Sequence, residues 1–161
     1  MKNASIRTKL LALRPALLSD ALGKTGAMDH DMRCWSRNCR MAGPATTLRV
    51  HPADLLMVVK AISVCPKGNV LVIDGQGELN TALWGGITTI CARLKGIEAV
   101  VIDGAVRDVA EIERQALPVF ARAAVPRAAA TGRMPSLVDT HSKLRVWPAL
   151  QAGREEAVAL V

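Results

Sequence analysis

Aromatic residues are scarce in this chain, whose 161 residues include no tyrosine, one phenylalanine and three tryptophans. Proteins that bind single-stranded nucleic acid usually set aromatic side chains among basic ones, so that bases can stack on them. The net charge of +7 comes instead from the flanks, residues 1–51 and 122–161, while the centre of the chain is mildly acidic. We therefore expect no nucleic-acid partner.

Long apolar runs are absent as well. No stretch approaches the roughly 20 apolar residues that cross a bilayer, so we expect no membrane partner. Two early basic residues and an apolar patch near the N-terminus would suit a short signal peptide. Arg14 and Pro15 interrupt that patch, which favours a cytoplasmic protein.

The chain has only four cysteines, and no two of them have CxxC spacing. Structural zinc sites use closely paired ligands, so the spacing argues against zinc. Buried cysteine behaves as a small hydrophobic residue. We expect all four to be reduced and structural, as in a reducing compartment: Cys34, Cys39, Cys65 and Cys91.

Several nucleotide-binding and nucleophile motifs are missing. The GQG at 75–77 would need a third glycine where the chain has Asn80, so a dinucleotide fingerprint is not formed. No P-loop is present, and no histidine stands beside a serine or cysteine in a known nucleophile motif. These absences argue against dinucleotide enzymes, P-loop NTPases and serine or cysteine hydrolases.

What the chain does have is a regular alternation of strands and helices. Apolar and β-branched runs predict strands at 45–50, 69–74, 97–103 and 117–122. Helical spacing predicts helices at 52–64, 75–96 and about 108–115, a helix and turn at 15–29, and a loop at 104–107. The Gly85-Gly86 pair should end a short helix near Leu83 and start another near Ile87. The alternation predicts a layered α/β domain with parallel strand pairing.

Two of the predicted strands end in Asp-Gly, at Asp74-Gly75 and Asp103-Gly104. Right-handed crossovers would place both ends at the same edge of the sheet, where ligands gather in parallel α/β proteins. Asp-Gly is also common turn chemistry, so a purely structural role stays open. We expect the first end to shape a pocket and the second to lead into the chemistry.

The second Asp-Gly end is followed by Arg107, Asp108 and Glu111. On a helix, Asp108 and Glu111 would share a face, and carboxylates of this kind suit Mg²⁺ or Mn²⁺. The planar guanidinium of Arg107 could bind a carboxylate or a developing oxyanion. A helix-capping aspartate with an exposed ion pair explains the spacing equally well.

From about residue 19 to 127 the chain resembles the RraA-like family, which includes 4-hydroxy-4-methyl-2-oxoglutarate aldolase and the regulator of ribonuclease activity A. The matching segments are SDALGKTGAMD, RMAGPATTLRV, GNVLVIDGQGELNTALWGG, GIEAVVIDGAVRDVAEI and LPVFAR, in that order. The resemblance implies a layered α/β/α-type domain with a partly parallel central sheet. Residues 1–127, including the helical segment 1–30, would form that domain, and 128–161 a divergent tail.

The resemblance also implies roles for individual residues. Asp108 would anchor a divalent metal cation, Mg²⁺ or Mn²⁺, and Arg107 would bind the 2-oxo acid and steady its enolate. Backbone N–H groups of the turn would bind the pyruvate carboxylate, and Glu111 would lie just outside the direct metal ligands. The implied activity is aldol cleavage to pyruvate, with oxaloacetate decarboxylation, in a homotrimer. The turn consists of Gly85, Gly86, Ile87 and Thr88.

Two features depart from the family pattern. The aldolase pattern has an acid twenty intervening residues before Arg107, where this chain has Gly86, and Glu78 is a poor substitute. From about Ala128 the tail no longer resembles the family, as if it were replaced or frameshifted, and the chain is several dozen residues shorter than expected. Two other hypotheses therefore stand beside the lyase: a non-catalytic regulator that binds a ribonuclease or helicase, and an inactive truncated homologue.

Overall fold

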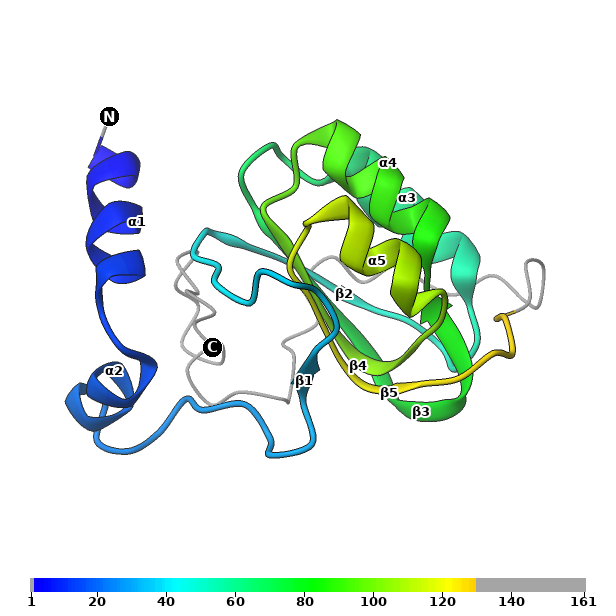
Figure 1. Ribbon diagram of the computed structural model, residues 1–161, viewed down its shortest axis with the longest axis horizontal. Coiled ribbons are helices and arrows are strands. Elements are labelled where there is room, and N and C mark those ends of the chain that lie inside the picture. The colour runs from blue at the N-terminus through cyan, green and yellow to red at the C-terminus, as the bar shows by residue number, and fades with distance from the viewer. Residues whose placement is uncertain (1, 130–161) are drawn as a thin grey trace.

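The computed structural model describes residues 2–129, which contain a five-stranded sheet of order β1-β5-β4-β3-β2 (Figure 1). Strands β2 to β5 pair in parallel, and the two-residue β1 runs antiparallel at the β5 edge. The predicted α/β class with a partly parallel sheet is confirmed. The strands are β1 (Arg33–Cys34), β2 (Ala45–Arg49), β3 (Val70–Trp84), β4 (Ala99–Val106) and β5 (Val119–Ala124).

Three helices cover one face of the sheet (Figure 1). They are α3 (Leu55–Val64), α4 (Gly86–Lys95) and α5 (Val109–Gln115), close to the predicted helices at 52–64, from Ile87 and at 108–115. Their inward residues, including Val58, Ala92 and Ile112, pack on apolar side chains of the strands. Within residues 2–129 no helix is long and apolar enough to span a membrane.

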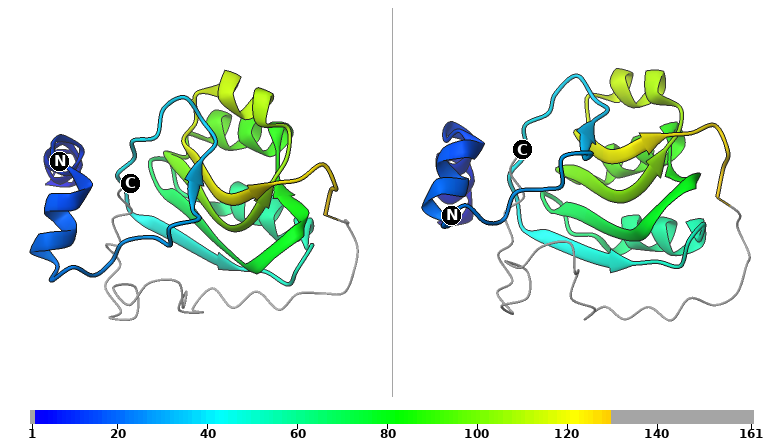
Figure 2. Two further views of the ribbon diagram at one scale, coloured as in Figure 1. Left: turned by 60° about the horizontal axis from the view of Figure 1, so that its bottom comes forward. Right: turned by 90° about the horizontal axis from the view of Figure 1, so that it is seen from below.

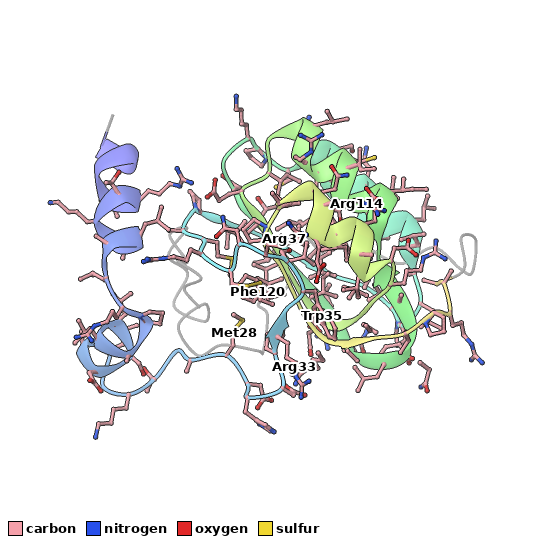
Figure 3. The ribbon with its side chains drawn as sticks, viewed as in Figure 1. Met28, Arg33, Trp35, Arg37, Arg114 and Phe120 are labelled. Atoms are coloured by element: carbon pink, nitrogen blue, oxygen red, sulfur yellow. A yellow bond between two sulfur atoms is a disulfide. The ribbon has the colours of Figure 1, made fainter. Side chains whose placement is uncertain are left out.

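On the other face of the sheet, apolar side chains of the segment 28–41 pack against the strands. Met41 and Phe120 are fully buried there with the valines of β3 and β4. Met28 packs against the same cluster, and Figure 3 shows it with Phe120 on the side away from Arg114 of α5. The described helices therefore lie on one face of the sheet only, apart from the two that precede this segment.

Those two N-terminal helices, α1 (Lys2–Ala12) and α2 (Pro15–Ala21), stand to one side of the sheet (Figure 2). Polar contacts hold α1: the Arg7 Nε donates to the Ala42 carbonyl at 3.0 Å, and the Arg7 guanidinium pairs with Glu98. Helix α2 contains no buried residue. The predicted helix and turn at 15–29 is confirmed as the shorter helix α2.

Local chemistry sets where the helices begin and end. The Asp54 carboxylate accepts the backbone N–H groups of Leu56 at 3.1 Å and Met57 at 3.4 Å, so it caps α3. Helix α4 ends at Gly96, whose φ of 80° is the left-handed conformation that favours glycine. The predicted break at Gly85-Gly86 is confirmed, because α4 starts at Gly86 with Gly85 as its N-cap.

The prediction of a helix from residue 75 to Leu83 is wrong, because β3 continues to Trp84. Gln76 and Gly77 have positive φ values of 58° and 69°, which break the strand locally. The chain then rejoins β4, where Ala82 pairs with Ala105. The loop predicted at 104–107 is likewise mostly strand, since β4 runs to Val106.

The two Asp-Gly ends lie side by side, because Asp74 of β3 is the register partner of Asp103 of β4. The prediction that both reach the same edge of the sheet is confirmed. The strands then extend beyond this point, and Trp84 pairs with Val106 at their far ends. Helices α4 and α5 start immediately after these far ends, so the turn at 85–88 and the Arg107-Asp108 pair are neighbours.

The expectation of four reduced cysteines is wrong for two of them. Cys34 and Cys39, whose Cα atoms lie 5.8 Å apart, form a disulfide. Its loop docks on β5: the Trp35 indole donates to the Ala121 carbonyl at 3.0 Å, and the Ser36 hydroxyl accepts the Val119 N–H at 3.0 Å. The other two are free as expected, Cys65 buried and Cys91 exposed.

We expect reduction of this disulfide to lower the free energy of unfolding by about 2 kcal/mol, because opening a short loop restores chain entropy to the unfolded state. The melting temperature should fall by roughly 5 °C. Thermal melts with and without a phosphine reductant measure the change. The Cys91→Ser variant is the control, because it retains the disulfide and should show the same fall in melting temperature on reduction. A melting temperature independent of reductant would contradict this role.

Candidate functional site

The predicted site residues come together at the ends of β3 and β4. The Arg107 N–H donates to the Trp84 carbonyl at 2.9 Å. This bond holds the end of β4 beside the start of the turn at 85–88. The Gly86 N–H donates to the Asp108 Oδ2 at 3.3 Å. The carboxylate thus lies at the N-terminus of α4, where the helix dipole and unpaired N–H groups favour negative charge.

The turn from Gly85 to Thr88 is held by its own hydrogen bonds. The Thr88 hydroxyl accepts the Gly85 N–H at 2.9 Å, and the Thr89 N–H donates to the Gly85 carbonyl at 3.0 Å. The N–H groups of Ile87 and Thr88 belong to the first turn of α4 and have no acceptor within the helix. They are the groups that a bound carboxylate could engage.

Asp108 has a left-handed backbone conformation, with φ 56° and ψ 43°, immediately before α5. Aspartate tolerates this conformation better than most residues. Its carbonyl starts α5 by accepting the Glu111 and Ile112 N–H groups at 2.9 and 3.1 Å. Its side chain makes no capping bond to α5 and reaches the Gly86 N–H instead, so the alternative of a helix-capping carboxylate is wrong.

Arg107 lies beside this carboxylate, with its Nε 3.7 Å from the Asp108 Oδ2. Its side chain is 39% exposed, and Asp108 is its ion-pair partner among the described residues. A Cβ on Gly85 would lie 3.0 Å from both the Arg107 Cγ and the Asp108 Oδ2. Glycine at this position therefore leaves space for the Arg107 and Asp108 side chains. The guanidinium is therefore placed to bind an anion at the mouth of the turn.

Glu111 lies on the first turn of α5, and its carboxylate faces the rest of that helix. Its Oε2 accepts the Arg114 Nε at 3.1 Å, and its Oε1 accepts the Gln115 amide at 2.6 Å. The Arg114 guanidinium, followed by the Gln115 amide, holds the pKa of Glu111 below its usual range. The exposed ion pair that the alternative interpretation expected is thus present at Glu111.

Asp108 is the carboxylate of this site that could hold a divalent cation. In residues 2–129 no group of three or more His, Cys, Asp and Glu side chains is placed to hold a metal ion. Asp108 offers a half-exposed carboxylate, and Mg²⁺ commonly uses one or two carboxylates with water and substrate oxygens. The donor set is therefore compatible with Mg²⁺ or Mn²⁺ whose coordination a chelating substrate completes.

A separate cavity of about 630 Å³ lies on the opposite face of the sheet. Asp74 and Asp103 both line it, because each follows by two residues a valine of the cluster that the 28–41 segment covers. The expectation that the first Asp-Gly end shapes a pocket is therefore confirmed, and the second end lines the same pocket. The turn at 85–88, Arg107, Asp108 and Glu111 do not line it. Its lining is Ala27, Met28, Asp29, His30, Arg49, Asp74, Gln76, Asp103 and Arg122.

The charges in this cavity are paired with one another. The Arg122 guanidinium bonds to Asp103, Asp31 and Asp29, and the Arg49 Nε lies 3.3 Å from the Asp74 Oδ2. Burial alone would lower the pKa of Arg122, but its hydrogen bonds to Asp103 and Asp31 outweigh burial and raise that pKa. This arrangement fixes the N-terminal segment to the sheet.

Arg122, Asp29 and Asp31 are not among the residues that the sequence singles out, whereas Asp103 is. The position of Arg122 could have been predicted, because it ends the predicted strand 117–122 at the same edge of the sheet as Asp74 and Asp103. The positions of Asp29 and Asp31 had no such signal, since they lie in a loop and a turn without periodicity. Asp74 does make a turn, as its Oδ1 accepts the Gln76 N–H at 3.0 Å.

Comparison with known proteins agrees with this architecture. Residues 15–145 match the model of the RraA-like family, described as Aldolase/RraA. An uncharacterized protein of Methanocaldococcus jannaschii is 40% identical over 87 residues, 53% of this chain and 42% of its own length. The 4-hydroxy-4-methyl-2-oxoglutarate aldolase of Thermus thermophilus is 37% identical over 113 residues, 70% of this chain and 68% of its own length.

A solved structure gives the same result. The RNA-processing inhibitor RraA from Thermus thermophilus superimposes with a TM-score of 0.72 at 31% identity, over 92% of this chain and 83% of that one. The sequence relatives are matched over only part of their length, less than half for the M. jannaschii protein. The family match includes the sheet and both halves of the site, the turn at 85–88 and the Arg107-Asp108 pair, and the chain therefore belongs to the RraA-like family.

Proposed function

We propose that this chain is a divalent-metal-dependent lyase that cleaves 2-oxo acids of the 4-hydroxy-4-methyl-2-oxoglutarate type to pyruvate. One observation carries the proposal: the half-exposed Asp108 carboxylate lies at the N-terminus of α4 with Arg107 beside it. An anion-binding turn, a cation-binding carboxylate and a guanidinium then border one small site. The aldolase named among the relatives supports the same substrate class.

Each residue has a physical role in this proposal. The Ile87 and Thr88 N–H groups, at the positive end of α4, bind the substrate carboxylate and orient the 2-oxo acid. Asp108 holds the cation, which would supply Lewis-acid polarisation of the ketone. Cleavage leaves negative charge on the pyruvate enolate, and Arg107 stabilises that charge where it develops. Oxaloacetate decarboxylation gives the same enolate, so it should occur at the same site.

We also propose a homotrimer in the cytoplasm. Three apolar side chains of α3 and α4 are exposed, with exposed fractions of 59% for Leu56, 75% for Ile87 and 74% for Leu94, and Ile87 belongs to the turn at 85–88. A neighbouring subunit that covered them would also close the open side of the turn. For the domain organisation, we propose that residues 1–127 form the family core; the proposed tail, 128–161, lies almost wholly outside the described residues.

A coupled assay for pyruvate tests the function. With Mg²⁺ or Mn²⁺, 4-hydroxy-4-methyl-2-oxoglutarate and oxaloacetate should each release pyruvate, and a chelator should stop the release. 2-Oxo acids that have an apolar side chain and no cleavable bond are the substrate control. Release that never exceeds the rate with cation alone would contradict the proposal.

A second candidate, a non-catalytic regulator that binds a ribonuclease or helicase, is favoured by two observations. Gly86 lacks the acid of the aldolase pattern, and the Thermus structure is described as an RNA-processing inhibitor. Inhibition of a purified endoribonuclease, with Asp108→Asn as active as the wild type, would support it. Absence of inhibition together with pyruvate release would exclude it in favour of the lyase.

A further inference from the structure

Two buried polar side chains lie directly behind the turn at 85–88. Trp84 ends β3 and Thr89 belongs to α4, and the Trp84 indole N–H donates to the Thr89 hydroxyl at 2.8 Å. The Trp84 carbonyl also accepts the Arg107 N–H, so Trp84 contacts both halves of the site. The proposed chemistry uses neither of these side chains directly.

The direction of the Thr89 hydroxyl is fixed by the indole. An indole N–H only donates, so the hydroxyl oxygen accepts at Trp84 and its hydrogen is left for the Gly85 carbonyl, 2.8 Å away. Threonine in a helix often bonds back to the carbonyl four residues earlier, and that bond by itself indicates no function. Here the buried indole makes this direction obligatory. The Gly85 carbonyl is therefore held toward the interior of the protein.

The orientation of this carbonyl sets the orientation of the Gly86 N–H. Both groups belong to one planar peptide and point in opposite directions from it. While the carbonyl is bonded to Thr89, the Gly86 N–H faces the Asp108 Oδ2 and donates to it at 3.3 Å. Glycine on both sides gives this peptide unusual rotational freedom, because no Cβ restricts the adjoining dihedral angles. A rotated peptide would turn its carbonyl oxygen toward the carboxylate and repel it.

We propose that Thr89 is a positioning residue that presents the Gly86 N–H to Asp108, with the indole behind it as its anchor. Two other groups reach the same carbonyl, the Thr89 N–H at 3.0 Å and the Thr88 hydroxyl at 2.9 Å. The first is the ordinary bond of any helix, and the Thr88 hydroxyl lies nearer the surface, where it can turn to water. The inference rests on the proposed function only in taking Asp108 as the ligand of the cation.

Four variants separate the hydroxyl from the shape of the side chain. Thr89→Val and Thr89→Ala lack the hydroxyl, the first with nearly the same shape and the second with a better helix former, whereas Thr89→Ser retains it. The matched control is Thr46→Val on β2, which removes a hydroxyl that accepts the Asn69 amide at 2.9 Å. Thr46 pairs with Leu71 near the start of β3, whereas the turn follows the end of that strand. A general loss of stability would therefore appear in Thr46→Val as well.

Nuclear magnetic resonance of the metal-free chain tests the positioning without turnover. In Thr89→Val the Gly86 amide should exchange with solvent about tenfold faster than in the wild type, because local opening of its bond to Asp108 becomes easier. Its proton resonance should move upfield as that bond weakens. Thr89→Ala should show the same changes, and Thr89→Ser and Thr46→Val should show neither. Circular dichroism confirms that each variant is folded.

Mn²⁺ titrations, followed by electron paramagnetic resonance of the free ion, connect the positioning to the cation. Thr89→Val should bind Mn²⁺ about tenfold more weakly than the wild type, the usual effect of losing a group that orients a metal ligand. Thr89→Ser and Thr46→Val should bind as the wild type does. Saturating Mn²⁺ should restore most of the pyruvate release of Thr89→Val, since the reacting groups themselves are intact.

The outcomes separate this inference from the proposed function. If Gly86 exchange and Mn²⁺ binding are the same in Thr89→Val as in the wild type, the positioning role is overturned, and pyruvate release by the wild type still supports the lyase. Equal losses in Thr89→Ser or Thr46→Val would also overturn it, because they would assign the effect to stability. If the wild type binds no Mn²⁺ while Thr89→Val shows the faster exchange, the positioning of the Gly86 N–H stands and the lyase proposal falls.

Discussion

Replacing Asp108 by asparagine is expected to lower pyruvate release by about a thousandfold, because the several kcal/mol of Lewis-acid stabilisation at this site would be lost. Asparagine keeps the size of the side chain, still accepts the Gly86 N–H and tolerates the left-handed backbone at this position. The fold should therefore survive. Steady-state kinetics with saturating Mg²⁺ measure the loss, and Mn²⁺ titration should show that binding is lost with it.

Glu113→Gln is a suitable control, since it removes an exposed charge from α5 without touching the turn. Its turnover should equal that of the wild type. Pyruvate release by Asp108→Asn within a few-fold of the wild-type rate would mean that the reaction does not depend on this carboxylate.

Replacing Arg107 by methionine should lower kcat by roughly a hundredfold to a thousandfold, the usual effect of removing one group that stabilises an oxyanion. Methionine keeps the apolar stem that packs near Gly85 but removes the charge. Arg107→Lys should recover part of the loss, because an ammonium restores the charge without the planar fork. Measurement of kcat and KM for both variants gives the size of each contribution.

The division between kcat and KM tests the role assigned to Arg107. A charge that acts on the developing enolate lowers kcat, whereas a charge that only binds the substrate raises KM. An Arg107→Met variant with normal kcat and a raised KM would assign this residue to substrate binding alone.

Much of the sheet could be predicted because the residues of its strands themselves show a strand pattern. The runs at 45–50, 97–103 and 117–122 are apolar and β-branched, as strands buried between two layers must be. The meeting of Asp74 with Asp103 followed from the rule that parallel strands end at one edge. The turn at 85–88 and the Arg107-Asp108 pair were named from the family resemblance. Both halves of the candidate site were therefore accessible from sequence.

The errors came from contacts between distant parts of the chain. Residues 75–84 have no clear strand period, and only their pairing with β4 and the Ala82 N–H bond to the Arg127 carbonyl make them extended. The Cys34–Cys39 disulfide depends on the loop that docks on β5, which no spacing rule describes. The packing of Glu111 against Gly86 joins two helices, and helical periodicity within either one does not report it.

The central claim is that Asp108, Arg107 and the start of α4 form one cation-dependent site. A crystal soaked with Mn²⁺ and oxalate, a mimic of the pyruvate enolate, tests it most directly through the anomalous scattering of manganese. The account predicts a manganese peak at the Asp108 carboxylate, with oxalate between the metal and the Ile87 and Thr88 N–H groups. A peak in the cavity between Asp74 and Asp103, with none at Asp108, would contradict it.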